Sequence, residues 1–188
     1  CKEGKTAVIN TLEMAQAEVI ARLIARESNV TMNKIIGKEL TKEIEWQSLA
    51  EARKIIANWK LRVREDGLRT ISEIDSYLTM RAANHDRVDL FVIDHFGLLS
   101  PEGKVTGNRA SDYKKISNDL KQLAKKHKCV MIILAQLNRG VGMTDRPEMG
   151  NLADTSALEQ DADKVLALYR DASDTRMVNV AVLKNRQG

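Results

Sequence analysis

Polar side chains that suit phosphoryl transfer follow several short apolar segments of this sequence. Glu13, Asp94 and Gln136 each stand at the end of one such segment, and Lys184 and Arg186 stand at the end of a fourth. If the segments are parallel strands, their carboxyl ends meet at the edge of the sheet where ligands bind. One carboxylate there can hold Mg²⁺, another can orient an attacking water, and an amide can contact a terminal phosphate.

Each of these residues also has a structural explanation. Asp94 ends its segment as in the Walker B arrangement, in which the carboxylate holds Mg²⁺ beside a nucleoside triphosphate, but aspartate caps many strands. Glu13 could be a general base or a first-turn glutamate that favours the helix dipole. Gln136 could contact a phosphate or only satisfy a loop, and Lys184 and Arg186 could form the solvated edge of a strand. Their conjunction favours phosphoryl transfer.

The tripeptide Gly4-Lys5-Thr6 matches the end of the phosphate-binding loop GxxxxGK[ST]. A complete loop has another glycine upstream, at a position before Cys1, and leads into a helix. Ala7–Ile9 instead predicts a short buried strand. We therefore expect a turn that carries Lys5 into a strand, and no phosphate site.

Helical periodicity appears in two segments of the first half of the chain. Met14–Arg26 and Thr41–Trp59 place apolar residues on one face, so both are predicted to be helices that face the core. Thr70–Glu73 has the form of a capping box and predicts the start of a third helix.

The second half of the chain predicts a parallel sheet. Val88–Asp94 and Cys129–Ala135 are nearly continuous apolar runs, typical of strands covered on both faces. An apolar helical stripe lies between them, so residues 88–135 predict one βαβ unit. The stripe consists of Tyr113, Ile116, Leu120 and Leu123.

Two more strands are predicted at Lys164–Tyr169, after a short helix capped by Ser156 and Glu159, and at Met177–Leu183. Pro101–Asn108 and Gly140–Asn151 contain both prolines and five of the ten glycines. They are therefore predicted to be long loops within one domain. The expected fold class is α/β with a mainly parallel sheet.

Composition sets broad limits on function. The 188 residues are 43% hydrophobic, enough for one domain with a substantial core, and no run approaches the roughly 18 apolar residues of a membrane span. The net charge of +4 allows an anionic partner but does not require one. Two distant cysteines favour a reducing compartment. The three histidines, His85, His95 and His127, show no zinc-ligand spacing.

Taken in order, the motifs resemble those of the C-terminal ATPase domain of the DnaB-type replicative helicases, which are hexameric rings with a RecA-type fold in bacteria and their phages. The resemblance extends over nearly the whole chain. It rests on Thr11–Met14 (family SLEM), Val88–Asp94 (Walker B), Ala135–Arg139 (SQLNR), Ser156–Asp163 (GSIEQDAD), Tyr169–Asp171 (YRD) and Lys184–Gly188 (KQRNG).

This resemblance implies binding of ATP and Mg²⁺, with Glu13 as catalytic base, Asp94 as the magnesium carboxylate and Gln136 as the group that reports nucleotide state. It implies that Lys184 and Arg186 act on ATP bound by the neighbouring subunit, with Arg186 as an arginine finger.

In such rings Arg170 would belong to the nucleotide site. The family's phosphate-binding loop lies on a strand and helix upstream of SLEM. Residues 1–188 are therefore expected to be a single, incomplete RecA-type domain that binds ATP weakly or not at all by itself.

The resemblance also implies that the loops 101–108 and 150–156 grip the phosphate backbone of single-stranded DNA in the ring's channel. The candidate residues are Lys104, Arg109, Asp154, Thr155 and Ser156. Here the chain departs from the family, because Ala153–Ser156 stands where RESG is common, so an arginine and a glycine are missing.

The implied protein is a cytoplasmic helicase of a bacterium or a phage-infected cell that moves 5′ to 3′, with primase and a helicase loader as partners and no membrane. Two alternatives remain open. One is another RecA-type ATPase of recombination or of a clock, and the other is a non-catalytic ring or loader homologue.

Overall fold

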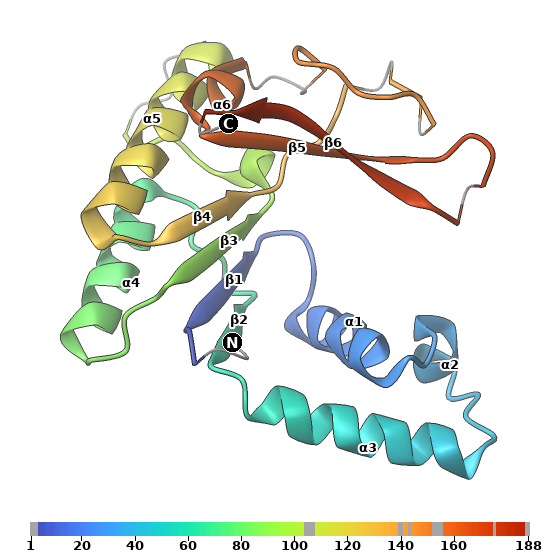
Figure 1. The fold of residues 1–188 in the computed structure, drawn as a ribbon. Helices are drawn as coiled ribbons and strands as arrows, with labels where there is room; N and C mark the ends of the chain where they lie inside the picture. The colour runs from blue at the N-terminus through green and yellow to red at the C-terminus, as the bar shows by residue number, and fades with distance from the viewer. Residues whose placement is uncertain are drawn as a thin grey trace.

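The centre of the molecule is a four-stranded parallel sheet with the strand order β2-β1-β3-β4 (Figure 1). The computed structural model describes residues 4–103, 108–138, 141–142, 144–151, 156–174 and 176–186. The four strands are β1 (Ala7–Thr11), β2 (Leu61–Arg64), β3 (Leu90–Asp94) and β4 (Val130–Ile133). The predicted α/β class is confirmed.

One face of this sheet carries the core. Helices α4 (Ile71–Ala83) and α5 (Arg109–His127) cover it, and α5 joins β3 to β4 as the predicted crossover. The core consists of residues from both layers, among them Val8, Phe91 and Ile93 from the sheet and Ile74, Leu78, Ile116 and Leu120 from the helices. No described helix is long and apolar enough to cross a membrane.

The capping box that was predicted for α4 is present. The Thr70 hydroxyl accepts a hydrogen bond from the Glu73 N–H at 3.3 Å, and the Glu73 carboxylate accepts one from the Thr70 N–H at 2.9 Å. Backbone N–H donation from Thr70 and Arg69 lowers the pKa of Glu73. Both residues thus satisfy donors at the helix start that would otherwise lack partners.

Helices α1 (Gln16–Ser28), α2 (Met32–Ile36) and α3 (Glu43–Ala57) lie on the other side of the sheet and extend away from it (Figure 1). The prediction that the first and third face the core is largely wrong. Val19 is the buried residue of α1 and Ala52 that of α3, whereas Ile44 is 63% exposed. The reason is that α1 packs against α3 and α2 more than against the sheet.

Strand β4 is also more exposed than its sequence predicts. Val130 is 64% exposed, Ile132 46% and Leu134 44%. Among the described residues, β4 is an edge strand that pairs only with β3, so one apolar face has no cover. The expectation of cover on both faces therefore fails for this strand.

Strands β5 (Lys164–Arg170) and β6 (Val178–Asn185) confirm two predicted strands but form a separate antiparallel sheet. Asp171 stabilises the turn after β5, where its carboxylate accepts hydrogen bonds from the Ser173 hydroxyl and N–H. These bonds lower the pKa of Asp171 to about 2. Strand β6 runs antiparallel to β5 and, among the described residues, pairs with none of the four parallel strands.

Asp75 links α4 to the end of α5, and its replacement tests how much this link contributes to stability. The carboxylate accepts from Lys126 Nζ at 2.7 Å and lies 2.6 Å from His127 Nε2. The Lys126 and His127 hydrogen bonds lower the pKa of Asp75 from its ordinary 3.8. We expect Asp75→Asn to cost about 1 kcal/mol at neutral pH, measured by urea denaturation.

The pH dependence of that loss follows from the direction of the shift. A carboxyl group with a lowered pKa stabilises the fold above its unfolded-state pKa and loses this contribution as the pH falls through its folded-state pKa. The difference between wild type and Asp75→Asn should therefore shrink below pH 3.8. Asp119→Asn, which removes a carboxylate from α5, is the control. A difference that persists in strong acid would contradict the assignment.

Candidate functional site

The tips of β1 and β3 bring two of the predicted site residues together. The strands are parallel and Thr11 is paired with Asp94, so the residues that follow β1 lie beside the end of β3. The Leu12 N–H donates to the Asp94 carbonyl at 2.7 Å, and the Thr11 hydroxyl accepts from the Met14 N–H at 2.9 Å. This tight turn leaves Glu13 exposed at the sheet edge.

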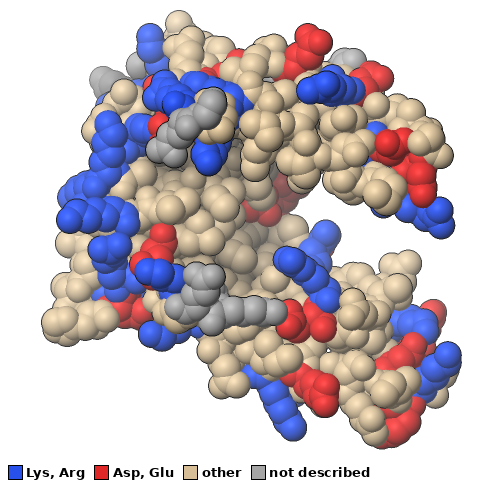
Figure 2. Space-filling view, in the orientation of Figure 1, with Lys and Arg blue, Asp and Glu red and all other residues tan. Residues whose placement is uncertain are grey.

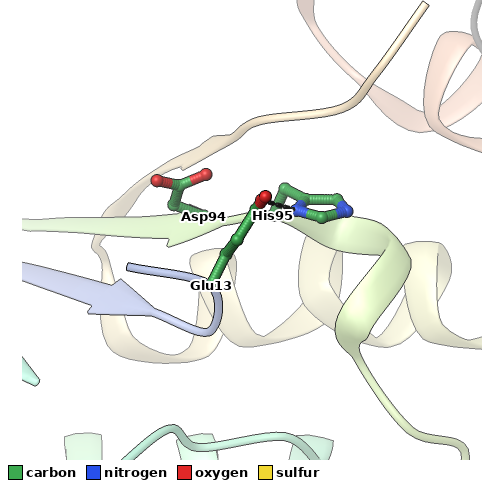
Figure 3. Close-up of side chains that lie close together, drawn as sticks. All are labelled: Glu13, Asp94 and His95. Carbon is green, nitrogen blue, oxygen red and sulfur yellow. Dashed lines mark ion pairs between the residues drawn. The ribbon is translucent and has the colours of Figure 1, made fainter. Parts of the chain in front are cut away.

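His95 joins this pair. Its Nδ1 lies 3.0 Å from Glu13 Oε2, and Figure 3 shows the two side chains pointing toward one another. One ligand atom from each of Glu13, Asp94 and His95 lies within 4.8 Å of the others. Sequence spacing gave no sign of a metal site that includes a histidine. The residues meet through strand register, which local spacing does not reveal.

The donor set at this edge fits Mg²⁺. Mg²⁺ prefers carboxylate oxygens and retains several waters, and Glu13 and Asp94 supply the oxygens at a site where Glu13 is exposed. Figure 2 shows that the molecule is deeply hollowed between the β5–β6 sheet and helices α1–α3. The tips of β1 and β3 lie at the inner end of that hollow (Figure 1).

Gln136 lies just beyond the neighbouring strand. The Leu134 N–H donates to the Ile93 carbonyl at 3.0 Å, and the Leu134 carbonyl accepts from the Phe96 N–H at 2.9 Å. These bonds hold the segment after β4 against the segment after β3. Gln136 follows it as an exposed residue near the same sheet edge.

Lys184 and Arg186 lie elsewhere, which corrects the expectation that four strand tips converge. Lys184 Nζ donates to the carbonyls of Glu159 at 2.6 Å and Gln160 at 2.8 Å, and Arg186 Nη2 donates to the Gln160 carbonyl at 2.6 Å. These carbonyls belong to α6 (Ser156–Asp161). The end of β6 is therefore tied to the last turn of α6, beside α5 (Figure 1).

Arg170 is the last residue of β5, and Figure 1 shows that β5 ends toward the β5–β6 turn, away from the tips of β1 and β3. It lines a hollow of about 420 Å³ with seven other residues of β5, β6 and the segment after β4. They are Leu137, Asn138, Val141, Gly142, Leu168, Tyr169 and Val178.

The predicted DNA residues are only partly described. Lys104, Asp154 and Thr155 lie outside the described residues. Arg109 is the first residue of α5, and its guanidinium donates to the Tyr113 hydroxyl at 2.8 Å. Ser156 is the exposed first residue of α6.

The two residues predicted to cap α6 both lie within the helix. Ser156 is its first residue, and Glu159 is buried with its carboxylate accepting a hydrogen bond from the Gly150 N–H at 2.7 Å. Glu159 thus ties Gly150 to the helix.

Gly4-Lys5-Thr6 forms a turn, as expected. Gly4 has φ +75°, and the Thr6 N–H donates to Asp89 Oδ2 at 2.9 Å. Lys5 Nζ lies 4.0 Å from Asp89. The tripeptide is at the amino end of β1, opposite Glu13, and its groups face a carboxylate. It is therefore unsuited to bind phosphate.

Comparisons with known proteins agree with this architecture. The replicative DNA helicases DnaC of Bacillus subtilis (strain 168) and DnaB of Geobacillus stearothermophilus are each 27% identical over 195 residues, covering 100% of this chain and 42% of each relative. The chain thus spans about two-fifths of the length of these relatives.

Two solved structures share the fold. One, an ATPase domain, matches with a TM-score of 0.86 and 28% identity, over 100% of this chain and 69% of that one. The other, a DnaB-like replicative helicase studied for its interactions with primase, matches with a TM-score of 0.88 and 29% identity, over 100% and 47%. The parallel sheet is thus that of a RecA-like ATPase domain.

The family described as DnaB-like helicase C terminal domain matches residues 1–188, the full length of the chain. The chain therefore belongs to the family of DnaB-like helicase C-terminal domains.

Proposed function

We propose that this chain is the motor domain of a replicative DNA helicase, which hydrolyses ATP at the subunit interfaces of a hexameric ring and moves 5′ to 3′ on single-stranded DNA. The observation that carries the proposal is the meeting of Glu13 and Asp94 at the tips of paired parallel strands in a member of this family. This arrangement supports phosphoryl transfer.

The roles of the residues at this edge follow from their chemistry. Asp94 would hold Mg²⁺, which neutralises negative charge on the phosphates of ATP. Glu13, exposed beside it, would accept a proton from the attacking water. Gln136 would contact the terminal phosphate and report its loss to the segment after β4.

Lys184 and Arg186 would act on the nucleotide of the adjacent subunit. Their position supports this assignment, because they lie at the end of β6 beside α6 and not at the β1 and β3 tips. To reach a neighbour they would exchange the α6 carbonyls for phosphate oxygens. Arg170, also distant from the tips, would contact nucleotide across the same interface.

The exposed apolar face of β4 supports the proposal that another segment of the ATP site packs there. The open edge of β4 and its exposed Val130, Ile132 and Leu134 suit pairing with another strand and cover by a helix. We propose that the segment with the phosphate-binding loop occupies this place. Burial of each side chain would contribute on the order of 1–2 kcal/mol.

DNA would be held through its backbone by Lys104, Arg109, Asp154, Thr155 and Ser156, since contacts to phosphates carry no sequence information. Six copies of the chain would form the ring. The primase interactions reported for one related structure support primase as a partner, and a helicase loader would place the ring on DNA. We place the protein in the cytoplasm of a bacterium or a phage-infected cell.

The proposal predicts that the full-length protein unwinds a forked DNA with a free 5′ tail when ATP and Mg²⁺ are present. Asp94→Asn should reduce both unwinding and DNA-stimulated ATPase by at least about tenfold, because the magnesium carboxylate is lost. Asp66→Asn, at a 67% exposed side chain, is the control.

Other results would favour the alternatives. DNA-dependent ATP hydrolysis without unwinding would favour another RecA-type ATPase. A ring that assembles but neither hydrolyses ATP nor unwinds DNA would favour a non-catalytic homologue.

A further inference from the structure

The sheet edge that carries the two carboxylates also carries a histidine. We propose that Glu13, Asp94 and His95 together bind a divalent first-row transition-metal ion, with the imidazole nitrogen as a direct ligand. The inference concerns the same edge as the proposed function and depends on that function only for its effect on ATP hydrolysis.

The spacing of the three side chains suits one ion. Bonds from such an ion to nitrogen or carboxylate oxygen are about 2.0–2.2 Å long, so two adjacent ligand atoms lie about 3 Å apart. Glu13 Oε2 and His95 Nδ1 are 3.0 Å apart, and the Asp94 ligand atom is within 4.8 Å of both. In Figure 3 the Glu13 carboxylate lies between the other two side chains.

The direction of the imidazole nitrogen gives a second, independent observation. His95 Nδ1 is buried and, within the described part of the chain, has no hydrogen-bond partner, although Glu13 Oε2 is only 3.0 Å away. The oxygen is thus out of line with the ring N–H direction. When two atoms bind one ion at right angles, the lone pair of each points about 45° away from the line that joins them. A shared ion explains both the short distance and the poor alignment.

The neighbours of His95 hold its ring in place. A Cβ atom on Gly97 would lie 3.3 Å from His95 Nε2 and 3.4 Å from its Cδ2, so the ring rests against a residue without a side chain. The His95 carbonyl accepts from the Leu98 N–H at 3.1 Å. The Thr11–Met14 turn holds the backbone beside Glu13, so binding would mainly order the exposed Glu13 side chain.

The donor set selects the class of metal. Imidazole binds Co²⁺ and Zn²⁺ more tightly than Mn²⁺, but all three ions accept a mixture of nitrogen and carboxylate ligands. Mg²⁺ instead prefers oxygen ligands alone. An ion bound by all three side chains would occupy Glu13, the proposed base. We therefore expect Zn²⁺ to inhibit ATP hydrolysis measured with Mg²⁺, and His95→Asn to relieve this inhibition.

The test uses the full-length protein without nucleotide and Mn²⁺ as the probe. Pulsed electron paramagnetic resonance should detect nitrogen coupling to bound Mn²⁺, and this signal should disappear in His95→Asn and Asp94→Asn. His95→Asn should weaken Mn²⁺ binding by roughly 10–100-fold and change Mg²⁺ binding far less. His127→Asn is the matched control, because His127 also contacts a carboxylate, that of Asp75.

Two results would overturn the proposal: Mn²⁺ bound without nitrogen coupling, or equal Mn²⁺ affinity in wild type and His95→Asn. If His95→Asn does not fold, as judged by circular dichroism, the coupling in wild type and its loss in Asp94→Asn decide the question. Neither overturning result affects the proposed function. Nitrogen coupling in a protein without ATPase activity would instead overturn only the proposed function.

Discussion

Glu13→Gln in the full-length ring is expected to lower DNA-stimulated ATP hydrolysis by a factor on the order of 10²–10⁴, the usual contribution of a general base. Glutamine keeps the size of the side chain but cannot accept the proton of the attacking water. The side chain is 58% exposed and Glu13 lies outside the hydrophobic core, so folding and ring assembly should not change. Steady-state phosphate release measures the rate, and size-exclusion chromatography measures assembly.

The matched control is Glu18→Gln, in the first turn of α1. Glu18 forms an ion pair with Arg22 at 2.8 Å, on the surface of the helix, and surface pairs of this type contribute little. This variant should keep the wild-type rate. An unchanged rate of hydrolysis in Glu13→Gln would show that another group activates the water. Glu13 would then have only the structural role of a glutamate near a helix start.

The sequence predicts the central βαβ unit well because its signals are local. The apolar runs of β3 and β4, the stripe of α5 and the capping box at Thr70 each arise from neighbouring residues. Glu13 and Asp94 could be identified for the same reason, since each follows a recognisable strand.

Features that depend on distant partners were missed. Strand β2 has arginines at two of its four positions, which hides the strand pattern. Arg62 pairs with Asp86 at 3.1 Å, and the Arg64 guanidinium lies 4.5 Å from the centre of the Tyr77 ring. Contacts with Asp86 and Tyr77 allow two arginines to stand in a strand. Both partners are distant in the sequence, so no local pattern predicts these contacts. His95 was not predicted to join Glu13 for the same reason, because the two residues are far apart in the sequence.

The exposure of β4 and α3 has a different origin. Apolar residues such as Ile132 and Ile44 predict that a face is buried but not which element covers it. If no described element covers the face, the prediction that the face is buried fails, although the helix or strand itself was predicted correctly.

Arg186→Ala is expected to reduce ATP hydrolysis by the intact ring on the order of 10³–10⁵-fold, as for other arginine fingers. Arg186 lies 3.7 Å from Asp163 and bonds to the end of α6, so its removal leaves the Glu13 and Asp94 tips intact. Arg176→Ala is the control, because Arg176 is an exposed arginine whose ion pair with Asp174 lies within the β5–β6 turn. The control should retain full activity.

Mixing two inactive variants tests whether Arg186 acts on the neighbouring subunit. The Arg186→Ala subunit keeps Glu13, and the Glu13→Gln subunit keeps Arg186. Where the first supplies the strand tips and the second supplies the arginine finger, the interface has every catalytic group. In rings of head-to-tail interfaces assembled from equal amounts, about a quarter of the interfaces should be of this kind. ATP hydrolysis should therefore recover toward a quarter of the wild-type rate. If Arg186 served its own subunit, every site would lack one group, and verified mixed rings would stay inactive.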